Sequence, residues 1–215
     1  MVTPIPGKIE VLISKGKIGV LIEEHFDPFE FRKFNTFFPE QGYDVEYISY
    51  LWGQDKLTFG SNPEENKVKH LVDVTADVTK VKPSDYVCVI CIGAYAMDRL
   101  RYQDKVKKGQ ENNAPAVVFI RKAMAESNVK VGVICHGLWL LCVTDLLKGR
   151  QVTCAHNLIS DVENAGADLI YDEEKEQTAD IVIDGNLITG RHPGMVDLFV
   201  ETIVQELEKK QPSLV

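Results

Sequence analysis

The sequence predicts an α/β protein with a mostly parallel sheet, built as one domain. Short apolar, β-branched runs alternate with amphipathic segments along its 215 residues, and this alternation is typical of β-α-β units. A chain of this length can bury a sizeable core in a single domain. Because Ile9–Ile13 is also strand-like, we expect residues 1–15 to form an N-terminal extension or an added edge strand, and residues 16–215 to form the domain.

The N-terminal part of the sequence predicts a first β-α-β unit. Lys17–Ile22 and Asp44–Tyr50 are strand-like, and the segment between them is helical. Asp27 followed by Pro28 resembles a helix N-cap with proline at the first helical position, and Glu30 resembles the acid of a capping box. The buried stripe of this helix is expected to consist of Phe31, Phe34 and Phe38.

The middle of the sequence predicts a third buried strand and two helical segments. Tyr86–Ile92 is almost continuously apolar, as expected for a strand with both faces covered. Asp98–Asn113 is charged and permits a helix, and Ala116–Ala125 is amphipathic. Residues 51–83 are mostly polar, and residues 72–81 indicate a short strand or a turn.

The C-terminal part predicts a hairpin and a closing helix. Ile181–Ile183 and Leu187–Thr189 flank Asp184-Gly185-Asn186, a sequence typical of a tight hairpin turn. Shorter elements are expected before it: strands at Gln151–Ala155 and Leu169–Tyr171 and a helix at Asp161–Ala165. The closing helix has an apolar face made of Val196, Phe199, Val200, Ile203, Val204 and Leu207.

One segment joins a strand to a helix with a cysteine at the junction. Val129–Ile134 is typical of a buried strand, and apolar residues from Leu138 onward fall at helical spacing up to Gly149, a predicted C-cap. Cys135 lies between them on a tight turn, at the positive end of the following helix. Because that field favours a thiolate, we predict that Cys135 is a nucleophile with a lowered thiol pKa.

The composition limits the classes of binding partner and the cellular compartment that we expect for this protein. The formal net charge of −8 argues against nucleic acid and anionic membrane surfaces. No apolar run reaches transmembrane length, the N-terminus lacks the pattern of a secretion signal, and five scattered cysteines fit a reducing compartment. We therefore expect a cytoplasmic protein. No zinc-ligand spacing, phosphate loop or dinucleotide motif occurs, so we expect no cofactor and no metal.

Four motifs resemble the DJ-1/PfpI (ThiJ/PfpI) superfamily. They are ICHGLWLL, LLKGRQVT, ENAGADLI and VIDGNLITGRHPGMVDLF, and they occur in the family's order. Because His136 directly follows the cysteine, the first motif is most similar to the Cys-His-Gly motif of the PfpI-like intracellular protease/amidase branch. The resemblance implies a flavodoxin-like three-layer sandwich of the class I glutamine amidotransferase-like type, which agrees with the α/β prediction.

The resemblance implies catalytic roles for four residues. Cys135 corresponds to the nucleophile and His136 to its base. In the family, the acid that orients this histidine comes from a neighbouring subunit, which implies a homo-oligomer. Asp98 stands at the position of that acid, where the family has Glu, and Asp27 matches a further family carboxylate after the first strand, also usually Glu.

The resemblance also implies an oxyanion site. The family's loop after the third strand contains two glycines, which correspond to Gly93 and Ala94 here. The backbone N–H groups of Ala94 and His136 would then hold the oxyanion of an acyl-transfer reaction. Gly137 completes the Cys-His-Gly motif.

Several of these residues also have a purely structural interpretation. A cysteine near the end of a buried strand is often a small apolar residue of the core. Asp27 can act as a helix N-cap alone, and Asp98 can be the first acid of a solvated, charged helix. Cys88 and Cys91 form a C-x-x-C pair, but an odd separation on a strand turns them to opposite faces, which disfavours a shared metal or redox site.

Three classes of function remain open at this point. The first is a cysteine hydrolase acting on amide, peptide or glycated substrates. The second is a glyoxalase or lyase acting on small aldehydes, and the third is a non-enzymatic redox-sensing or chaperone-like protein in which Cys135 is the sensor. We favour the hydrolase, with a small-molecule or peptide substrate in a pocket shaped by Tyr95, Met97, Trp139 and the Lys105–Asn113 insertion.

Overall fold

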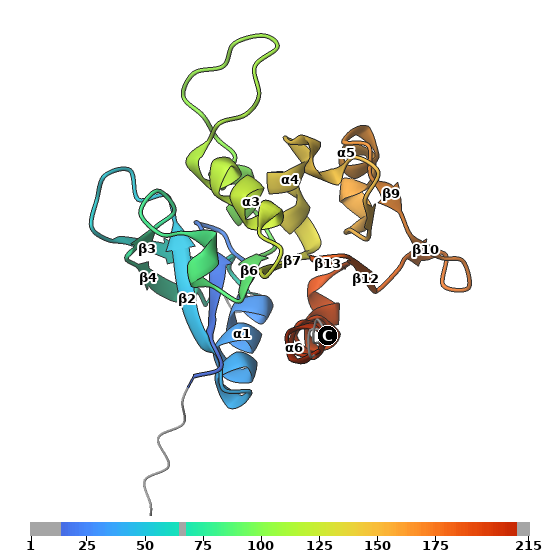
Figure 1. Cartoon of the computed structure of the whole chain (residues 1–215), viewed down its shortest axis with the longest axis horizontal. Helices are drawn as coiled ribbons and strands as arrows, with labels where there is room; N and C mark the ends of the chain where they lie inside the picture. Colours follow the sequence, from blue (N-terminus) through green and yellow to red (C-terminus); the bar gives the residue numbers. More distant parts are fainter. Residues whose placement is uncertain (1–13, 65–67, 210–215) are drawn as a thin grey trace, which may run out of the picture.

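The computed structural model describes residues 14–64 and 68–209, and these form three layers (Figure 1). The middle layer is a seven-stranded sheet with the order β12-β13-β7-β6-β1-β2-β5. Its strands are β1 (Lys17–Leu21), β2 (Asp44–Ser49), β5 (Ala76–Asp77), β6 (Cys88–Cys91), β7 (Lys130–Ile134), β12 (Ile181–Asp184) and β13 (Leu187–Gly190). Neighbouring strands of this sheet are parallel except β12 and β13, which confirms the predicted mostly parallel α/β fold.

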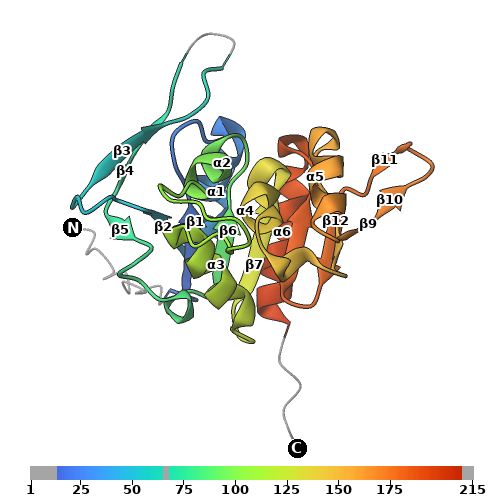
Figure 2. The same cartoon turned by 90° about the horizontal axis from the view of Figure 1, so that it is seen from above.

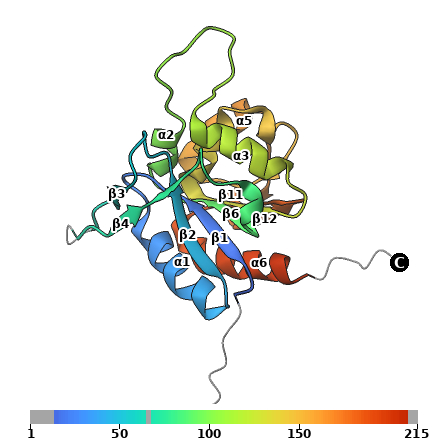
Figure 3. The same cartoon turned by 60° about the vertical axis from the view of Figure 1, so that its left-hand side comes forward.

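Helices cover both faces of the sheet. They are α1 (Pro28–Glu40), α2 (Ala96–Leu100), α3 (Pro115–Ala125), α4 (Trp139–Cys142), α5 (Ile159–Asn164) and α6 (Val196–Glu208). Figures 1 and 3 show α1 and α6 on one face and α3 with α4 and α5 on the other. Between α1 and α6, the rings of Phe34 and Phe199 lie with their centroids 6.4 Å apart. Because both faces are covered, β6 is buried at every position, as its apolar sequence predicts.

The start of α1 follows the predicted capping pattern only in part. The Asp27 side chain accepts hydrogen bonds from the N–H groups of Phe29 and Glu30, and Pro28 occupies the first turn. Glu30 does not complete a capping box, however, because its side chain is fully buried and accepts a hydrogen bond from Gly93. The capping-box prediction is therefore wrong, and Glu30 points into the interior.

Three pairs of short strands form small sheets separate from the central sheet. β3 (Leu57–Gly60) and β4 (Leu71–Val74) form an antiparallel hairpin within the segment that the sequence left largely unassigned. β8 (Gln151–Val152) pairs with β9 (Asp168–Leu169), and β10 (Tyr171–Asp172) pairs with β11 (Gln177–Thr178). Figure 2 shows the β3-β4 and β10-β11 hairpins at opposite ends of the molecule. The predicted strand at Gln151–Ala155 thus exists only as β8, outside the main sheet.

The charged segment after the third strand is mostly not helical. α2 ends at Leu100, and residues 101–113 form a long projecting loop (Figure 3). The Asn112 side chain joins the two ends of this loop, since it donates to the Arg101 carbonyl and accepts from the N–H of Ala114. The prediction of a helix over Asp98–Asn113 is therefore wrong, because the segment lacks an apolar stripe that could pack on the sheet.

The helix after Cys135 is broken into short pieces. A 3₁₀ helix at Cys135–Leu138 leads into α4, and a second 3₁₀ helix follows at Asp145–Leu147. The break lies at Thr144, whose hydroxyl donates to the Leu141 carbonyl and accepts from the N–H of Leu146, so that it ends one turn and caps the next.

Several other predictions can be compared with the structure. The hairpin predicted around Gly185 and the closing helix are confirmed as β12-β13 and α6. The strand-like run at Ile9–Ile13 lies outside the described residues. Among the described residues, no helix is both long enough and apolar enough to cross a membrane.

Two phenylalanines on α1 test the contribution of the buried face. We expect Phe34→Ala to lower the free energy of unfolding by about 3–5 kcal/mol, because the removed ring lies in a closed core. The matched variant Phe29→Ala, at a ring that is 56% exposed, should cost less than about 1 kcal/mol. Urea unfolding of both variants measures the difference, and equal losses would contradict the placement of α1.

Candidate active site

Cys135 lies at the point where β7 ends and the 3₁₀ helix begins. Its φ angle is +55°, a left-handed backbone conformation that residues other than glycine rarely adopt, and the residue is only 4% exposed. Such strain is found where the surrounding structure holds a functional residue in place. A Cβ atom at Gly137 would lie 2.6 Å from the Cys91 carbonyl oxygen, so glycine is needed for this turn to lie against β6.

The His136 side chain turns back towards the cysteine. Its Nδ1 atom lies 3.0 Å from the Cys135 Sγ atom, within hydrogen-bond distance for sulfur. Its Nε2 atom lies 2.8 Å from the side-chain amide of Asn157. The Trp139 ring packs edge-on against the imidazole with centroids 4.8 Å apart, and the Tyr95 ring lies 6.1 Å away. Adjacent positions in the chain therefore do bring the sulfur and the imidazole together.

Glu30 is the buried carboxylate of the site. Its Oε2 atom accepts a 2.6 Å hydrogen bond from the N–H of Gly93, and its Oε1 atom is buried without a hydrogen-bond partner among the described residues. A Cβ atom at Gly93 would lie 2.6 Å from Oε1 and 3.0 Å from the Cys135 Cβ atom, so both side chains border the same glycine. Glu30 thus occupies the position beside the cysteine for which the sequence suggested Asp27.

Sequence reasoning missed Glu30 although a signal was present. Glu30, Phe34 and Phe38 are spaced by four residues, which places all three on one face of a helix. Since Phe34 and Phe38 were predicted to be buried, the same spacing could have predicted a buried Glu30. Its position three residues after Asp27 suggested a capping role instead. Asn157 lies in no recognised motif, and no sequence signal pointed to it.

Backbone N–H groups converge on the cysteine sulfur. Ala94, which stands where the family motif has glycine, adopts a φ angle of +57°, in the left-handed region that favours glycine. An antiparallel bridge to Phe26 and the hydrogen bond from the N–H of Tyr95 to the His25 carbonyl hold this loop. The N–H groups of Ala94 and His136 both act to lower the pKa of the Cys135 thiol.

Burial outweighs those N–H groups. Burial raises the pKa of the Cys135 thiol above its usual value, and the nearby carboxylates of Glu30 and Asp27 act in the same direction. The expectation of a lowered thiol pKa is therefore wrong for the resting site. Burial, together with Asp27, also raises the pKa of the Glu30 carboxyl well above its usual value. A neutral Glu30 would carry its proton on the otherwise unpartnered Oε1 atom.

The pKa of the His136 imidazole shifts in the opposite direction from that of the Cys135 thiol. Burial lowers the pKa of His136 below 6.5, and the nearby His156 and His192 side chains lower it further. His136 is therefore neutral at pH 7. The site at rest contains a neutral thiol beside a neutral imidazole rather than a thiolate beside an imidazolium.

The other predicted site residues lie farther from the sulfur or are engaged elsewhere. Asp27 caps α1, as its structural interpretation holds. Asp98 is 49% exposed and forms an ion pair with Arg101 of the same chain. Cys88 and Cys91 are fully buried free thiols on β6. Within the described residues, no group of three or more histidine, cysteine, aspartate or glutamate side chains is arranged to hold a metal ion.

Comparison with models of protein families shows which family this chain matches. The model of the DJ-1/PfpI family matches residues 16–206, and this span contains the cysteine turn, the Gly93 loop and Glu30. The chain belongs to the DJ-1/PfpI family. An uncharacterized protein of Staphylococcus aureus is 32% identical over 173 residues, which cover 77% of this DJ-1/PfpI chain and 92% of that protein.

Solved structures agree with this family and fold. A two-domain protein from Anabaena variabilis with DJ-1/ThiJ/PfpI-like and ferritin-like domains is 26% identical with a TM-score of 0.74, covering 90% of this chain and 48% of that one. This DJ-1/PfpI chain thus spans about half the length of that protein. Two other solved structures share its fold. Drosophila melanogaster DJ-1beta is 18% identical with a TM-score of 0.68, covering 92% of both chains. The putative protease I of Bacteroides thetaiotaomicron is 14% identical with a TM-score of 0.66, covering 90% of this chain and 99% of that one.

Two substitutions at Asp27 separate its capping role from a catalytic one. Asp27→Ala should lower the free energy of unfolding by about 1 kcal/mol, because two N–H groups of α1 lose their acceptor. Asp27→Asn keeps an acceptor oxygen and should unfold close to the wild type in urea. If Asp27→Asn folds normally but abolishes alkylation of Cys135 by iodoacetamide, the purely structural interpretation is contradicted.

Proposed function

We propose that this protein is a cysteine-dependent hydrolase that acts on amide bonds of small molecules or peptides, including glycated amines. The observation that carries this proposal is the 3.0 Å contact between the Cys135 Sγ and His136 Nδ1 atoms. Both groups are neutral at pH 7, since burial raises the pKa of the thiol and lowers that of the imidazole. A neutral imidazole at this distance can accept the thiol proton as the sulfur attacks a carbonyl carbon.

The proposed reaction has two steps. In the first, the Cys135 sulfur bonds to the carbonyl carbon, His136 takes the thiol proton, and the N–H groups of Ala94 and His136 stabilise the oxyanion. The C–N bond then breaks, and His136 gives the proton to the departing amine, which leaves a thioester. In the second step, His136 takes a proton from water as its oxygen attacks the thioester, and the proton returns to the departing sulfur.

Asn157 is the group that we propose to orient His136 within the same chain. If Nδ1 accepts the thiol proton, Nε2 must carry a hydrogen and needs an acceptor. The Asn157 amide is 2.8 Å away, and a half-turn of the amide presents its oxygen to Nε2 without moving the backbone. This arrangement makes a Cys-His-Asn set that does not require an acid from a neighbouring subunit.

A homo-oligomer with Asp98 of a neighbouring subunit near His136 remains the competing proposal for this orienting role. Asp98 must then give up its ion pair with Arg101 and displace the Asn157 amide from Nε2. The free state of all five cysteines supports a reducing, cytoplasmic location for either arrangement.

The two alternative functions use the same cysteine. A glyoxalase or lyase acting on small aldehydes needs the same sulfur and base, and a substrate panel separates it from the hydrolase. A redox sensor is disfavoured because reactive sensor thiols are exposed and have a low pKa, whereas Cys135 is 4% exposed with a raised pKa.

Turnover by site variants tests the proposed roles. With a panel of amides, glycated amines and methylglyoxal, Cys135→Ala should abolish turnover, and His136→Ala should lower kcat by about 10²–10⁴-fold. Asn157→Leu should lower kcat by up to about 100-fold with little change in KM, since it misplaces the base, and Asp98→Asn is the matched control. A loss in Asp98→Asn with a normal Asn157→Leu variant would favour the acid from a neighbouring subunit. Turnover of methylglyoxal alone would contradict the hydrolase.

The pH dependence of the rate tests the protonation states. Because the pKa of His136 is lowered, the acid limb of kcat/KM, where the imidazole gains a proton, should be centred below pH 6.5. A pH profile of the wild type from pH 4.5 to 9 measures this acid limb. An acid limb centred above pH 6.5 would contradict the assignment of neutral His136 as the base.

A further inference from the structure

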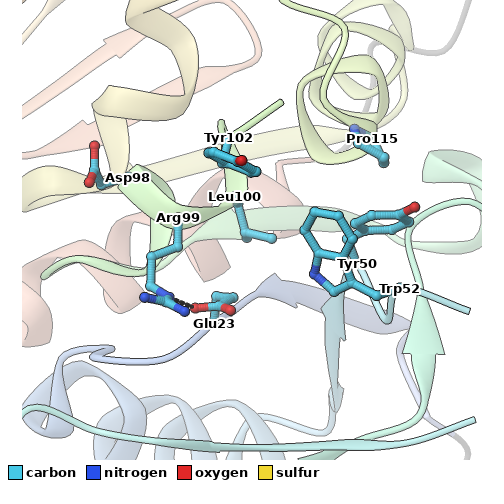
Figure 4. A pocket seen from close by; sticks show the side chains of 8 residues that line it. All are labelled: Glu23, Tyr50, Trp52, Asp98, Arg99, Leu100, Tyr102 and Pro115. Carbon is cyan, nitrogen blue, oxygen red and sulfur yellow. Dashed lines mark hydrogen bonds and ion pairs between the residues drawn. The ribbon is translucent and has the colours of Figure 1, made fainter. Parts of the chain in front are cut away.

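A cavity separate from the Cys135 site lies beside α2, at the carboxyl ends of β1 and β2. Its volume is about 460 Å³, and neither Cys135 nor His136 lines it. The residues that line it are Glu23, Tyr50, Trp52, Asp98, Arg99, Leu100, Tyr102 and Pro115. Figure 4 shows the rings of Tyr50 and Trp52 on one side, Tyr102 and Leu100 across from them, and Glu23 with Arg99 below. The crevice outside the carboxyl ends of parallel strands is a common place for ligands in α/β folds.

Three aromatic rings line this cavity. The centroids of Tyr50 and Trp52 are 4.5 Å apart, and those of Trp52 and Tyr102 are 6.5 Å apart. Trp52 is 49% exposed although its large apolar ring favours burial. Its φ angle is +53°, an unfavourable left-handed conformation that non-glycine residues adopt mainly at turns and functional sites. Trp52 and Gly53, whose φ angle is +80°, are the central residues of a turn closed by the hydrogen bond from the Gln54 N–H to the Leu51 carbonyl, and this turn places the exposed tryptophan beside two tyrosines.

The floor of the cavity carries a carboxylate with one oxygen left open. The Glu23 side chain is only 13% exposed, and its Oε2 atom accepts hydrogen bonds from the Arg99 side chain and the Glu24 N–H. Among the described residues, no hydrogen bond reaches its Oε1 atom. Burial raises the pKa of the Glu23 carboxyl in spite of Arg99, so the ion pair does not fully compensate this buried charge.

The charges that line the cavity favour a cation. Glu23 and Asp98 contribute two carboxylates, and Arg99 contributes one guanidinium. The partner of Asp98 is Arg101, whose guanidinium stands over the Trp139 ring 5.4 Å from its centroid and does not line the cavity. Aromatic ring faces carry negative potential and attract organic cations, most strongly where water is partly excluded.

We propose that this cavity binds a small organic cation of the alkylammonium class against the rings of Tyr50, Trp52 and Tyr102, with its charge beside Glu23. The rings supply contact with the alkyl groups, and the Glu23 carboxylate supplies the countercharge. The proposal does not depend on the hydrolase, because Cys135 and His136 do not line this cavity.

Tryptophan fluorescence with a matched pair of probes tests the preference for charge. The chain has two tryptophans, so Trp52 is the only one in a Trp139→Phe variant. Choline and 3,3-dimethylbutan-1-ol have the same shape, but only choline is charged. Choline should quench Trp52 in a saturable way and bind about 10-fold tighter than the neutral alcohol. We expect a Kd of about 1 mM for choline. Equal affinities for the two probes, or no saturable change at choline concentrations up to about 100-fold above that Kd, would overturn the proposal.

Two charge-removing variants at the floor give opposite expected results. Glu23→Gln should weaken choline binding about fivefold or more, whereas Arg99→Gln should leave it unchanged or strengthen it, because the removed charge repels the ligand. Glu111→Gln, at an exposed acid outside this cavity, is the matched control and should bind choline like the parent. Calorimetric titration of folded variants measures all three. Equal weakening by Glu23→Gln and Arg99→Gln would show that only the ion pair's structure matters and would overturn the proposed role of charge.

Discussion

The site depends on the left-handed turn at Cys135, which the parallel sheet makes possible. β7 pairs with β6 so that Cys91 lies opposite Val133, and the loops after both strands leave the sheet at the same edge. Gly137 lets the turn approach the Cys91 carbonyl oxygen, and Gly93 lets Glu30 approach the turn from α1. Three separate elements, α1, the loop after β6 and the turn after β7, therefore meet around one sulfur atom.

Burial determines the protonation states of Cys135, Glu30 and His136. A thiol, a carboxyl group and an imidazole lie close together with little access to water, and burial opposes the charged form of each. The site thus holds its groups neutral until a substrate arrives. Such a site suits a mechanism in which the proton moves as the sulfur attacks, and it suits less well a sensor that needs a standing thiolate.

Local sequence patterns predict much of the fold because strands, capping residues and hairpin turns leave local signals. The buried run of β6, the cap at Asp27 and the hairpin around Gly185 are examples. The helix expected over Asp98–Asn113 does not form beyond Leu100, since permissive composition without a packing face does not stabilise a helix. The family motif predicts the Cys135 turn, but it does not predict that burial reverses the expected shift of the thiol pKa.

The nature of the site depends more on contacts between distant residues. Asn157 reaches His136 across 21 positions of sequence, and Glu30 reaches Gly93 across 63, so neither contact leaves a pattern in a local window. Glu30 was nevertheless accessible to helical periodicity, since it shares a face with Phe34 and Phe38. The position of a carboxylate on a predicted apolar helix face is therefore a better indicator of a buried functional acid than its spacing from a helix N-cap.

The central claim is that the resting site pairs a neutral thiol with a neutral imidazole. Nitrogen-15 NMR of the His136 side chain at pH 7 tests it directly, because the two ring nitrogens report their own protonation. The account predicts a hydrogen on Nε2 and none on Nδ1, with the same spectrum at pH 7 and pH 8. An imidazolium protonated on both nitrogens at pH 7, which persists until Cys135 is alkylated, would show a thiolate–imidazolium pair and contradict the account.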